Sequence, residues 1–486
     1  MESFMKNIQS QTYVLNGWDF ICSFSNIPFT FFYKNPNNDR SAPFMPSDQL
    51  HKSFLRTLQD FPILAGHLVV DGRGYIVVDK NNLNMPEYIE SQSPINYEFV
   101  EAARFNWDAL PIQPSTVPAI PSKNADGKIK LINVHVVRFR NNSGIALFVN
   151  MPHYVVDGIG YSAFMKRWAE VNKWMQGNCT AQLPHREYTF DRAVLESAMP
   201  EIIPPLSNSC SRIYKTKTLL GYFLSWLSPE TRGSLLVEGN KLFSASGHVF
   251  YVTKNAIDKI RQQVTCDGQR LSDNDILTTM ISHTVAKGFY DAQNNAGIIK
   301  STTRSLMSSF LAPGEFLSLM TMDIRPRLKK LSQQTTQYLG GCITGLPIFN
   351  TINRLAQAGS STAAFGSSCS LVRKAVNDLD EKYVGAVDSV IRGSNCYAHS
   401  LALAVTTREK LIVTNQTRFG LYDCDFGIGA PKWVGPMPTF LTNYSSILPT
   451  NPLDNQGYYV YMSLEKYLME SVLQNEFWST HTSFVF

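Results

Sequence analysis

The sequence contains no apolar run long enough to cross a membrane. Its longest strongly apolar stretch, residues 219–227, is far shorter than the roughly 20 residues that a membrane helix requires. Residues 1–15 mix charged and polar side chains with single apolar ones and lack the continuous apolar centre of a secretory signal. We therefore expect a protein with no membrane span that resides in the cytoplasm.

Cysteine pairs and blocks of charge are also missing. The eight cysteines are spread widely, with no Cys-x-x-Cys pair and no His at zinc-finger spacing, so we expect reduced thiols and no metal site. Only 17% of the residues are charged, and the net charge of +5 is scattered without a run of like charges. This distribution argues against nucleic acid as a partner and gives only a weak indication of an anionic ligand such as a nucleotide phosphate.

Apolar residues, in contrast, are plentiful. They make up 44% of the 486 residues, which is enough for a large core, and the chain is too long for one ordinary domain. We predict an N-terminal domain over residues 1–185, a crossover segment interrupted by prolines over residues 186–245, and a C-terminal domain over residues 246–486.

The most informative local pattern is a pair of strands followed by a helix. Residues 130–139 and 144–150 are biased toward β-branched side chains and are joined by an Asn-Asn-Ser turn, which predicts an antiparallel pair. Residues 159–175 repeat apolar side chains at helical spacing with charged side chains between them. This periodicity predicts an amphipathic helix that packs on the sheet.

Other segments carry similar signals. A helix is expected to begin at Ser47 or Asp48, either of which can cap it, and to end before Pro62. Another is expected over residues 272–287 with a capping box formed by Ser272 and Asp275. Further helices are predicted at residues 254–264, 371–379 and 464–473, and further strands at residues 248–253, 317–324, 411–415 and 458–463. Residues 81–97, which are polar and interrupted by prolines, predict no particular element.

A candidate catalytic motif, His153-x-x-x-Asp157-Gly158, lies between the second strand and the helix, where a rigid scaffold often presents catalytic side chains. An imidazole is close to half-charged near neutral pH and can accept a proton from a hydroxyl or amine that attacks a thioester. No nucleophilic side chain is then required. The spacing alone is weak support, since composition by itself gives roughly 0.4 matches to His-x-x-x-Asp in this chain.

Both motif residues also have a structural interpretation. A lone histidine at a strand end is more often a hydrogen-bonded structural residue than a base. Asp157 directly precedes the predicted helix, where a carboxylate accepts backbone N–H groups and suits the positive end of the helix dipole. A dyad of His153 and Asp157 facing each other on one helix is disfavoured by Gly158 and Gly160.

A second motif, Asp425-Phe426-Gly427-Ile428-Gly429, follows about 270 residues after the first. Protein kinases also contain Asp-Phe-Gly, but this chain lacks the His-Arg-Asp loop and the glycine-rich loop of a kinase. Three Asp-x-Asp pairs could indicate a metal-dependent sugar transferase. Two of them lie at predicted helix ends, however, and no nucleotide-sugar pattern surrounds them.

Together, the two motifs in this order resemble the BAHD acyltransferases, a plant and fungal family defined by HxxxDG and DFGWG. Residues 55–68, 322–328 and 373–384 look like the family segments "L..yP.lAGRl", "vDxRxRl" and "iR.ai...deeyv", so the resemblance covers nearly the whole chain. It implies a two-domain α/β fold like that of chloramphenicol acetyltransferase, with mixed sheets flanked by helices and a channel between the domains.

The resemblance also implies an activity and its site. Acyl-CoA serves as co-substrate, with no permanently bound cofactor, and the acyl group passes to a hydroxyl or amine of a small molecule in a ternary complex. His153 is then the general base, and the Thr414 hydroxyl donates to the tetrahedral oxyanion. Asp157 pairs with Arg325, in place of its capping role or alongside it. Because one chain holds the whole site, we expect a monomer.

Further residues support the site structurally under this resemblance, and some positions depart from the family pattern. Besides Asp157 and Arg325, the supporting residues are Gly158, Asp425 and Gly427, the last two of which fix a loop on the coenzyme A side. Ile428 replaces the family tryptophan, residues 415–416 replace "SW", and residues 338–341 replace "YFGN". The packing of the coenzyme A loop and the orientation of the acceptor are therefore expected to differ. An aliphatic residue at the tryptophan position resembles the fungal, trichothecene-acetyltransferase-like arm.

Two alternative functions stay open. A condensation-type domain acts on carrier-protein thioesters, but such domains usually show two adjacent histidines, and Pro152 precedes His153 here. A catalytically silent relative would bind a metabolite or protein in the same channel, which the altered tryptophan position permits. The retention of His153, Gly158 and Thr414 argues against a silent protein.

Overall fold

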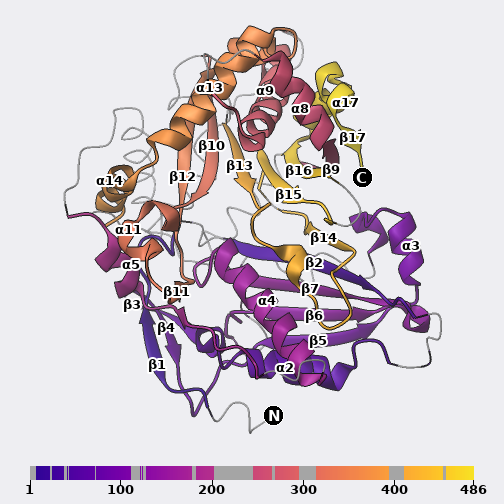
Figure 1. Ribbon diagram of the computed structural model, residues 1–486, viewed down its shortest axis with the longest axis vertical. Helices are drawn as coiled ribbons and strands as arrows, with labels where there is room; N and C mark the ends of the chain where they lie inside the picture. Colours follow the sequence, from indigo (N-terminus) through magenta and orange to yellow (C-terminus); the bar gives the residue numbers. More distant parts are fainter. Residues whose placement is uncertain are drawn as a thin grey trace.

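The structure is a computed structural model. It describes residues 7–486 except 22–24, 38–40, 42, 72, 111–120, 122, 124–126, 178–181, 202–244, 265–268, 295–313, 393–409, 440 and 453–455. Its elements form two α/β halves that lie one above the other along the long axis of the molecule, each with a large sheet covered by helices (Figure 1). None of the described helices has the length and apolar character that a membrane span needs.

The N-terminal half is built on a five-stranded sheet in the order β14-β2-β7-β6-β5. Its strands are β2 (Asn26–Lys34), β5 (Glu87–Gln92), β6 (Asn133–Arg138), β7 (Gly144–Pro152) and β14 (Trp433–Pro436). The central strand β7 pairs antiparallel with β2 and β6, and all nine of its residues are buried. Because β7 is enclosed in this way, it holds the residue that follows it, His153, in a fixed position.

Two helices, α2 (Ser47–Thr57) and α4 (Gly158–Met175), pack together on this sheet (Figure 1). The Trp168 indole of α4 is buried, stacks edge-on against Phe54 at 5.3 Å between ring centroids, and donates to Ser53 Oγ at 3.0 Å. The other elements of this half are η1 (Pro62–Ala65), β1 (Gln11–Val14), β3 (His67–Asp71), β4 (Arg73–Val78), α3 (Tyr97–Ala102), η2 (Trp107–Ala109), η4 (Arg140–Asn142), β8 (Tyr188–Thr189) and α5 (Arg192–Ala198).

The C-terminal half is built on a seven-stranded sheet in the order β12-β10-β13-β15-β16-β9-β17. Its strands are β9 (Ala245–Thr253), β10 (Glu315–Asp323), β12 (Ile343–Thr351), β13 (Lys410–Asn415), β15 (Tyr444–Pro449), β16 (Gly457–Glu465) and β17 (Ser483–Phe484). Strand β13 is parallel to both of its neighbours, whereas the other pairs are antiparallel. The remaining elements are α8 (Lys254–Gln263), α9 (Asp273–Asn294), η6 (Arg325–Arg327), α11 (Lys329–Ser332), β11 (Gln337–Tyr338), α12 (Ile352–Gln357), α13 (Thr362–Asp378), α14 (Glu381–Arg392), η8 (Leu421–Asp423), α16 (Lys466–Gln474) and α17 (Glu476–His481).

Two strand pairings join the halves. Strand β14 comes from the C-terminal part of the sequence but forms the edge of the N-terminal sheet, antiparallel to β2. Strand β11 pairs in parallel with β8. As a result, Trp433 and Val434 of β14 belong to the hydrophobic core of the N-terminal half.

The predicted elements are confirmed where the structure describes them. Residues 130–139 and 144–150 contain β6 and β7, residues 159–175 lie in α4, and each of the other predicted helices and strands overlaps an observed one. The capping box of α9 is also confirmed, because the Ser272 N–H donates to Asp275 Oδ2 at 2.7 Å and the Asp275 N–H donates to Ser272 Oγ at 3.3 Å. The predicted division at residues 185 and 245 stays a prediction.

One expected cap is wrong, and several strands have no counterpart among the predictions. Helix α2 begins after Pro46 without a side-chain cap, and Asp48 instead forms an ion pair with Lys52 at 2.7 Å, one turn along the helix. Residues 81–97 contain β5, which pairs with β6 although no residue of β5 is fully buried. The described cysteines, Cys342, Cys369 and Cys424, are buried free thiols, in agreement with the prediction for these three.

Candidate active site

His153 lies in a turn between the end of β7 and the start of α4. Its N–H donates to the Ser25 carbonyl at 2.9 Å, and the Val155 N–H closes the turn on the Pro152 carbonyl at 3.0 Å. Burial lowers the pKa of His153, although the Asp157 carboxylate and a backbone hydrogen bond partly oppose this shift. The ring is therefore neutral at neutral pH and can accept a proton.

Asp157 is fully buried and uses both of its oxygens. Oδ1 accepts the N–H groups of Ile159 and Gly160, each at 3.1 Å, and so caps α4. Oδ2 lies 2.8 Å from Arg325 Nη1 and accepts the Cys342 N–H at 3.1 Å. The capping role and the arginine pairing, which the sequence left as alternatives or companions, are both present.

Arg325 links Asp157 to the C-terminal half. Nη1 also reaches Asp323 Oδ1 at 2.9 Å, Nε donates to the Tyr338 carbonyl at 2.9 Å, and Nη2 donates to the Gly340 carbonyl at 2.8 Å. Burial alone would lower the pKa of Arg325, but Asp157 and then other neighbours raise it well above its usual value. The guanidinium stays charged, with each of its nitrogens bonded.

Gly158 is required by a close approach between the halves. A Cβ at this position would lie 2.3 Å from the ring of Phe419, which follows β13 in the sequence by a few residues. The contact brings the segment after Thr414 against the start of α4. Gly160 is equally enclosed, because its Cβ would lie 2.5 Å from the Leu339 carbonyl oxygen.

Thr414 lies near the C-terminal end of β13, opposite Thr321 of β10 and Ser446 of β15. Its side chain is partly exposed, and its hydroxyl makes no hydrogen bond within the part of the chain that the structure describes. The neighbouring Asn415, in contrast, donates from its amide to Asn274 at 2.8 Å and accepts from Thr417.

Asp425 organises its own loop. Oδ1 accepts the N–H groups of Gly427, Ile428 and Gly429 at 2.9, 3.0 and 2.7 Å, and Oδ2 pairs with Lys173 at 2.7 Å. Burial raises the pKa of Asp425, but Lys173 and the loop amides outweigh this effect and hold the pKa below its usual value. Gly427 has a φ of 94°, a left-handed conformation that favours glycine.

The structure does not bring Asp425 to His153. The loop is fixed to the C-terminal part of α4, where Asn172 and Gln176 donate to the Phe426 carbonyl at 2.9 and 3.0 Å. At 1.5 Å per residue, about 22 Å of helix separate this point from Asp157. Asp425 and Gly427 therefore lie away from the histidine turn, and their structural role stays a prediction.

Two charged residues that the sequence did not single out lie close to the histidine turn. Asp19 and Arg192 form a buried ion pair at 2.9 Å, although 173 positions separate them in the sequence. Asp19 precedes the described strand β2, and Arg192 begins α5. Because no local pattern connects two residues so far apart, only a family alignment could have indicated the pair.

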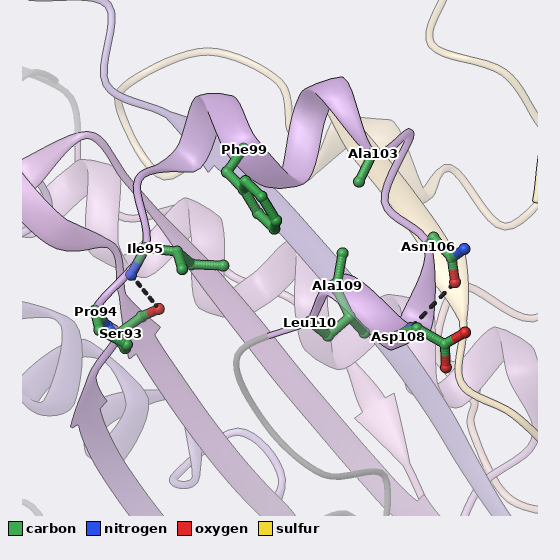
Figure 2. A pocket seen from close by; sticks show the side chains of 9 residues that line it. All are labelled: Ser93, Pro94, Ile95, Phe99, Ala103, Asn106, Asp108, Ala109 and Leu110. Carbon is green, nitrogen blue, oxygen red and sulfur yellow. Dashed lines mark hydrogen bonds between the residues drawn. The ribbon is translucent and has the colours of Figure 1, made fainter.

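Two cavities lie at the other end of the N-terminal sheet. Figure 2 shows the first, of about 460 Å³, between residues 93–95, α3 and η2, with Phe99 pointing into it. The Ser93 N–H donates to the backbone carbonyl of Arg138, and Arg138 pairs with Ile145 of β7. At 3.3 Å per residue, about 26 Å of strand β7 separate this cavity from His153. The second, of about 520 Å³, lies beside Trp433, near the same end of β7. The candidate site is therefore located by its motif residues rather than by these cavities.

No group of three or more His, Cys, Asp or Glu side chains that could hold a metal ion occurs among the described residues.

A family model, described as the Transferase family, matches residues 5–201 and 297–478, which include both motifs. The chain belongs to the BAHD acyltransferase family. It is accordingly an acyl-CoA-dependent acyltransferase that acts on a hydroxyl or amine of a small acceptor, as the resemblance implied.

Similar proteins agree with the BAHD assignment. Hydroxycinnamoyltransferase 1 of Oryza sativa subsp. japonica is 21% identical over 435 residues, which cover 87% of this chain and 86% of the relative. Among solved structures, TRI101 of F. graminearum, complexed with coenzyme A and deoxynivalenol, has a TM-score of 0.67 at 14% identity and covers 98% of this chain and 100% of that one. Vinorine synthase has a TM-score of 0.60 at 15% identity, with 96% and 95% covered. The two-domain BAHD fold is thereby confirmed.

Proposed function

We propose that His153 is the general base of the acyl transfer and that Asp157 is not its catalytic partner. The observation that carries the proposal is the complete use of the Asp157 carboxylate by two helix amides, Arg325 and the Cys342 amide. A carboxylate held in this way stabilises the turn and leaves the proton transfer to the imidazole. Burial, which lowers the pKa of His153, keeps the imidazole in its basic form.

We propose the following course for the reaction. His153 takes the proton of the acceptor hydroxyl or amine as the oxygen or nitrogen attacks the thioester carbon, and the resulting tetrahedral oxyanion accepts a hydrogen bond from Thr414. Collapse of the intermediate breaks the carbon–sulfur bond. The protonated His153 then returns its proton to the coenzyme A thiolate, so that ester or amide and free coenzyme A leave.

Direct transfer in a ternary complex is supported by two of the described cysteines, Cys342 and Cys424. Burial raises the pKa of both Cys342 and Cys424, so these thiols stay protonated and are poor nucleophiles. An acyl-cysteine intermediate on either residue is therefore disfavoured. The absence of a permanently bound cofactor, the cytoplasmic location and the monomeric state stay predictions.

Of the alternatives, a condensation-type domain is disfavoured by Pro152, which is buried in β7 where the first of two adjacent histidines would be. A silent relative is disfavoured by the neutral His153 imidazole and by the Thr414 hydroxyl, which has no hydrogen-bond partner among the described residues. The acceptor that we propose is a small molecule with a hydroxyl or amine, in line with the hydroxycinnamoyltransferases to which the chain is similar.

The test is the release of coenzyme A thiol by purified wild type, His153→Ala and His135→Ala, offered a panel of acyl-CoAs with pooled alcohols and amines. His135 lies on β6, paired with Phe148 of β7, and serves as a control histidine from the same sheet. We expect acceptor-dependent release that falls at least 100-fold in His153→Ala and persists in His135→Ala. Equal release by His153→Ala and wild type would exclude His153 as the base.

A further inference from the structure

The ion pair of Asp19 and Arg192 is sealed inside the protein. The exposed fraction of the side chain is 0% for Asp19 and 3% for Arg192. The pair is bidentate, because Arg192 Nε donates to Asp19 Oδ2 and Nη2 donates to Asp19 Oδ1, both at 2.9 Å. Nη1 donates to the Phe190 carbonyl at 2.7 Å. Burial alone would lower the pKa of Arg192, but Asp19 and neighbouring groups raise it, so the guanidinium stays charged.

Arg192 makes direct contact with the histidine turn. Its Nη2 donates to the Val155 carbonyl at 3.2 Å, two residues after His153 and two before Asp157. Val155 is completely buried, and β7 has already ended at Pro152. A buried carbonyl outside the sheet needs a hydrogen-bond donor, and Arg192 supplies it.

Asp19 is connected to the same turn through residues 340–342. Its Oδ1 accepts the Gly341 N–H at 3.1 Å, and the next N–H, that of Cys342, donates to Asp157 at 3.1 Å. There is no space for a side chain at Gly341, because a Cβ would lie 2.9 Å from both the Asp19 Cα and the Trp18 carbonyl oxygen. The segment is therefore held between the two carboxylates.

The His153 turn is thus fixed at two points by two buried ion pairs. Asp157 and Arg325 hold its C-terminal end, and Asp19 and Arg192 hold its middle. Both pairs bind residues 340–342 of the C-terminal half. Arg325 donates to the Gly340 carbonyl, and Asp19 and Asp157 accept the N–H groups of the next two residues. The second pair carries no net charge, so its effect on His153 is expected to be geometric.

We propose that Arg192, oriented by Asp19, is a positioning residue for the acyl transfer: it fixes the Val155 carbonyl and thereby the direction in which the His153 ring faces the acyl acceptor. The inference rests on the proposed role of His153 as base. A displacement of about 1 Å at a reacting group is enough to lower a rate roughly 100-fold, so a buried anchor two residues from the base is sufficient to control the rate.

The test compares Arg192→Lys with Arg167→Lys. Arg167 lies on α4 and is equally buried, with 3% exposed. It bonds to Asp60, Glu170 and the Pro184 carbonyl and, within the part of the chain that the structure describes, makes no hydrogen bond with residues 153–157. Lysine keeps the positive charge but lacks the planar, forked guanidinium that lets arginine bond to the Asp19 carboxylate and the Val155 carbonyl at the same time. We expect Arg192→Lys to lower kcat roughly 30- to 100-fold, with KM for acyl-CoA and Kd for coenzyme A within about twofold of wild type. Arg167→Lys should lose comparable thermal stability while kcat stays within about threefold.

Two further measurements complete the test. The apparent pKa in the pH profile of kcat/KM should be the same in Arg192→Lys as in wild type, since charge is conserved; a shifted pKa would show an electrostatic role and overturn the proposal. If Arg192→Lys does not fold, the deciding variant is Asp19→Asn, which keeps an oxygen to accept the Gly341 N–H. A lowered kcat at unchanged coenzyme A affinity in this variant supports the inference, and a wild-type kcat overturns it.

The outcomes separate the inference from the function on which it rests. Wild-type turnover in His153→Ala would remove the proposed base, and with it the need for positioning. An inactive His153→Ala together with equal kcat values for Arg192→Lys and Arg167→Lys would leave the base intact and overturn only the role of Arg192.

Discussion

Replacing Asp157 by alanine removes three interactions at once: the N-cap of α4, the ion pair with Arg325 and the acceptor of the Cys342 N–H. Because the carboxylate has no exposed surface, water cannot replace it without a rearrangement of the interface. Asp157→Asn is the matched variant, since its carbonyl oxygen can keep the cap while its NH2 group turns a donor toward Arg325 and Cys342.

The size of the effect follows from these contacts. Breaking one side of a buried ion pair costs about 3–5 kcal/mol, because the remaining charge is uncompensated, and loss of an N-cap costs about 1 kcal/mol. Arg325 keeps Asp323 and two carbonyls, which moderates the loss. We therefore expect Asp157→Ala to reduce the free energy of unfolding by about 4 kcal/mol and Asp157→Asn by about 2–3 kcal/mol. Both losses are large fractions of the total free energy of unfolding of a typical protein, which is about 5–15 kcal/mol.

Urea unfolding followed by circular dichroism measures these free energies. A double-mutant cycle with Arg325→Met tests the assignment, because the double variant should lose less than the sum of the two single losses. Activity should be reported for the folded fraction only, so that a catalytic contribution of the carboxylate would be visible separately.

Two results would refute the reasoning. A decrease of less than about 1 kcal/mol in the free energy of unfolding of Asp157→Ala would mean that the carboxylate does not stabilise the contact between the two halves. A protein of wild-type stability with no activity would mean that Asp157 acts on the chemistry as the partner of His153, against the geometry of its contacts.

Three further predictions concern the other site residues. Thr414→Val keeps the shape of the side chain and removes its donor, so kcat should fall roughly 100- to 1,000-fold with little change in KM, and Thr414→Ser should restore much of it. Because burial lowers the pKa of His153, the acid limb of the kcat/KM profile should have its midpoint below 6.5 and be absent from any residual activity of His153→Ala. The lowered pKa of Asp425 gives a stabilisation that is present above its unfolded value near 4 and is lost as the pH falls through the folded value. Asp425→Asn should therefore be less stable at pH 7, and its stability should fall less below pH 4, in thermal melts across pH.

The parts of the fold that the sequence predicts are those with local signals. The periodicity of α4, the alternation of β6 and β7 and the capping box of Ser272 and Asp275 each depend on residues within one element or turn. Local signals also mislead: Ser47 and Asp48 are good caps by type, yet the carboxylate of Asp48 bonds to Lys52.

Long-range pairings leave no such signal. The Asp157–Arg325 pair was expected only because the motifs resemble a known family; the spacing of the two residues does not indicate it. Asp19 and Arg192 had no motif to draw attention to them, and their pairing depends on how β8, β11 and the histidine turn meet in space. Strand β14 was not predicted because four residues that include Gly435 and Pro436 show little strand character of their own.

The crossing of β14 has a consequence for how the chain can be divided. An N-terminal fragment that ends before residue 433 would leave β2 without its outer neighbour. The backbone N–H and C=O groups of β2 that now bond to β14 would be unpaired, along a strand that contains Phe29, Phe31 and Phe32. Such an open, aromatic edge is a template for pairing with other chains. Separately expressed halves are therefore expected to aggregate, and co-expression of the two should restore solubility only when the second fragment carries residues 433–436.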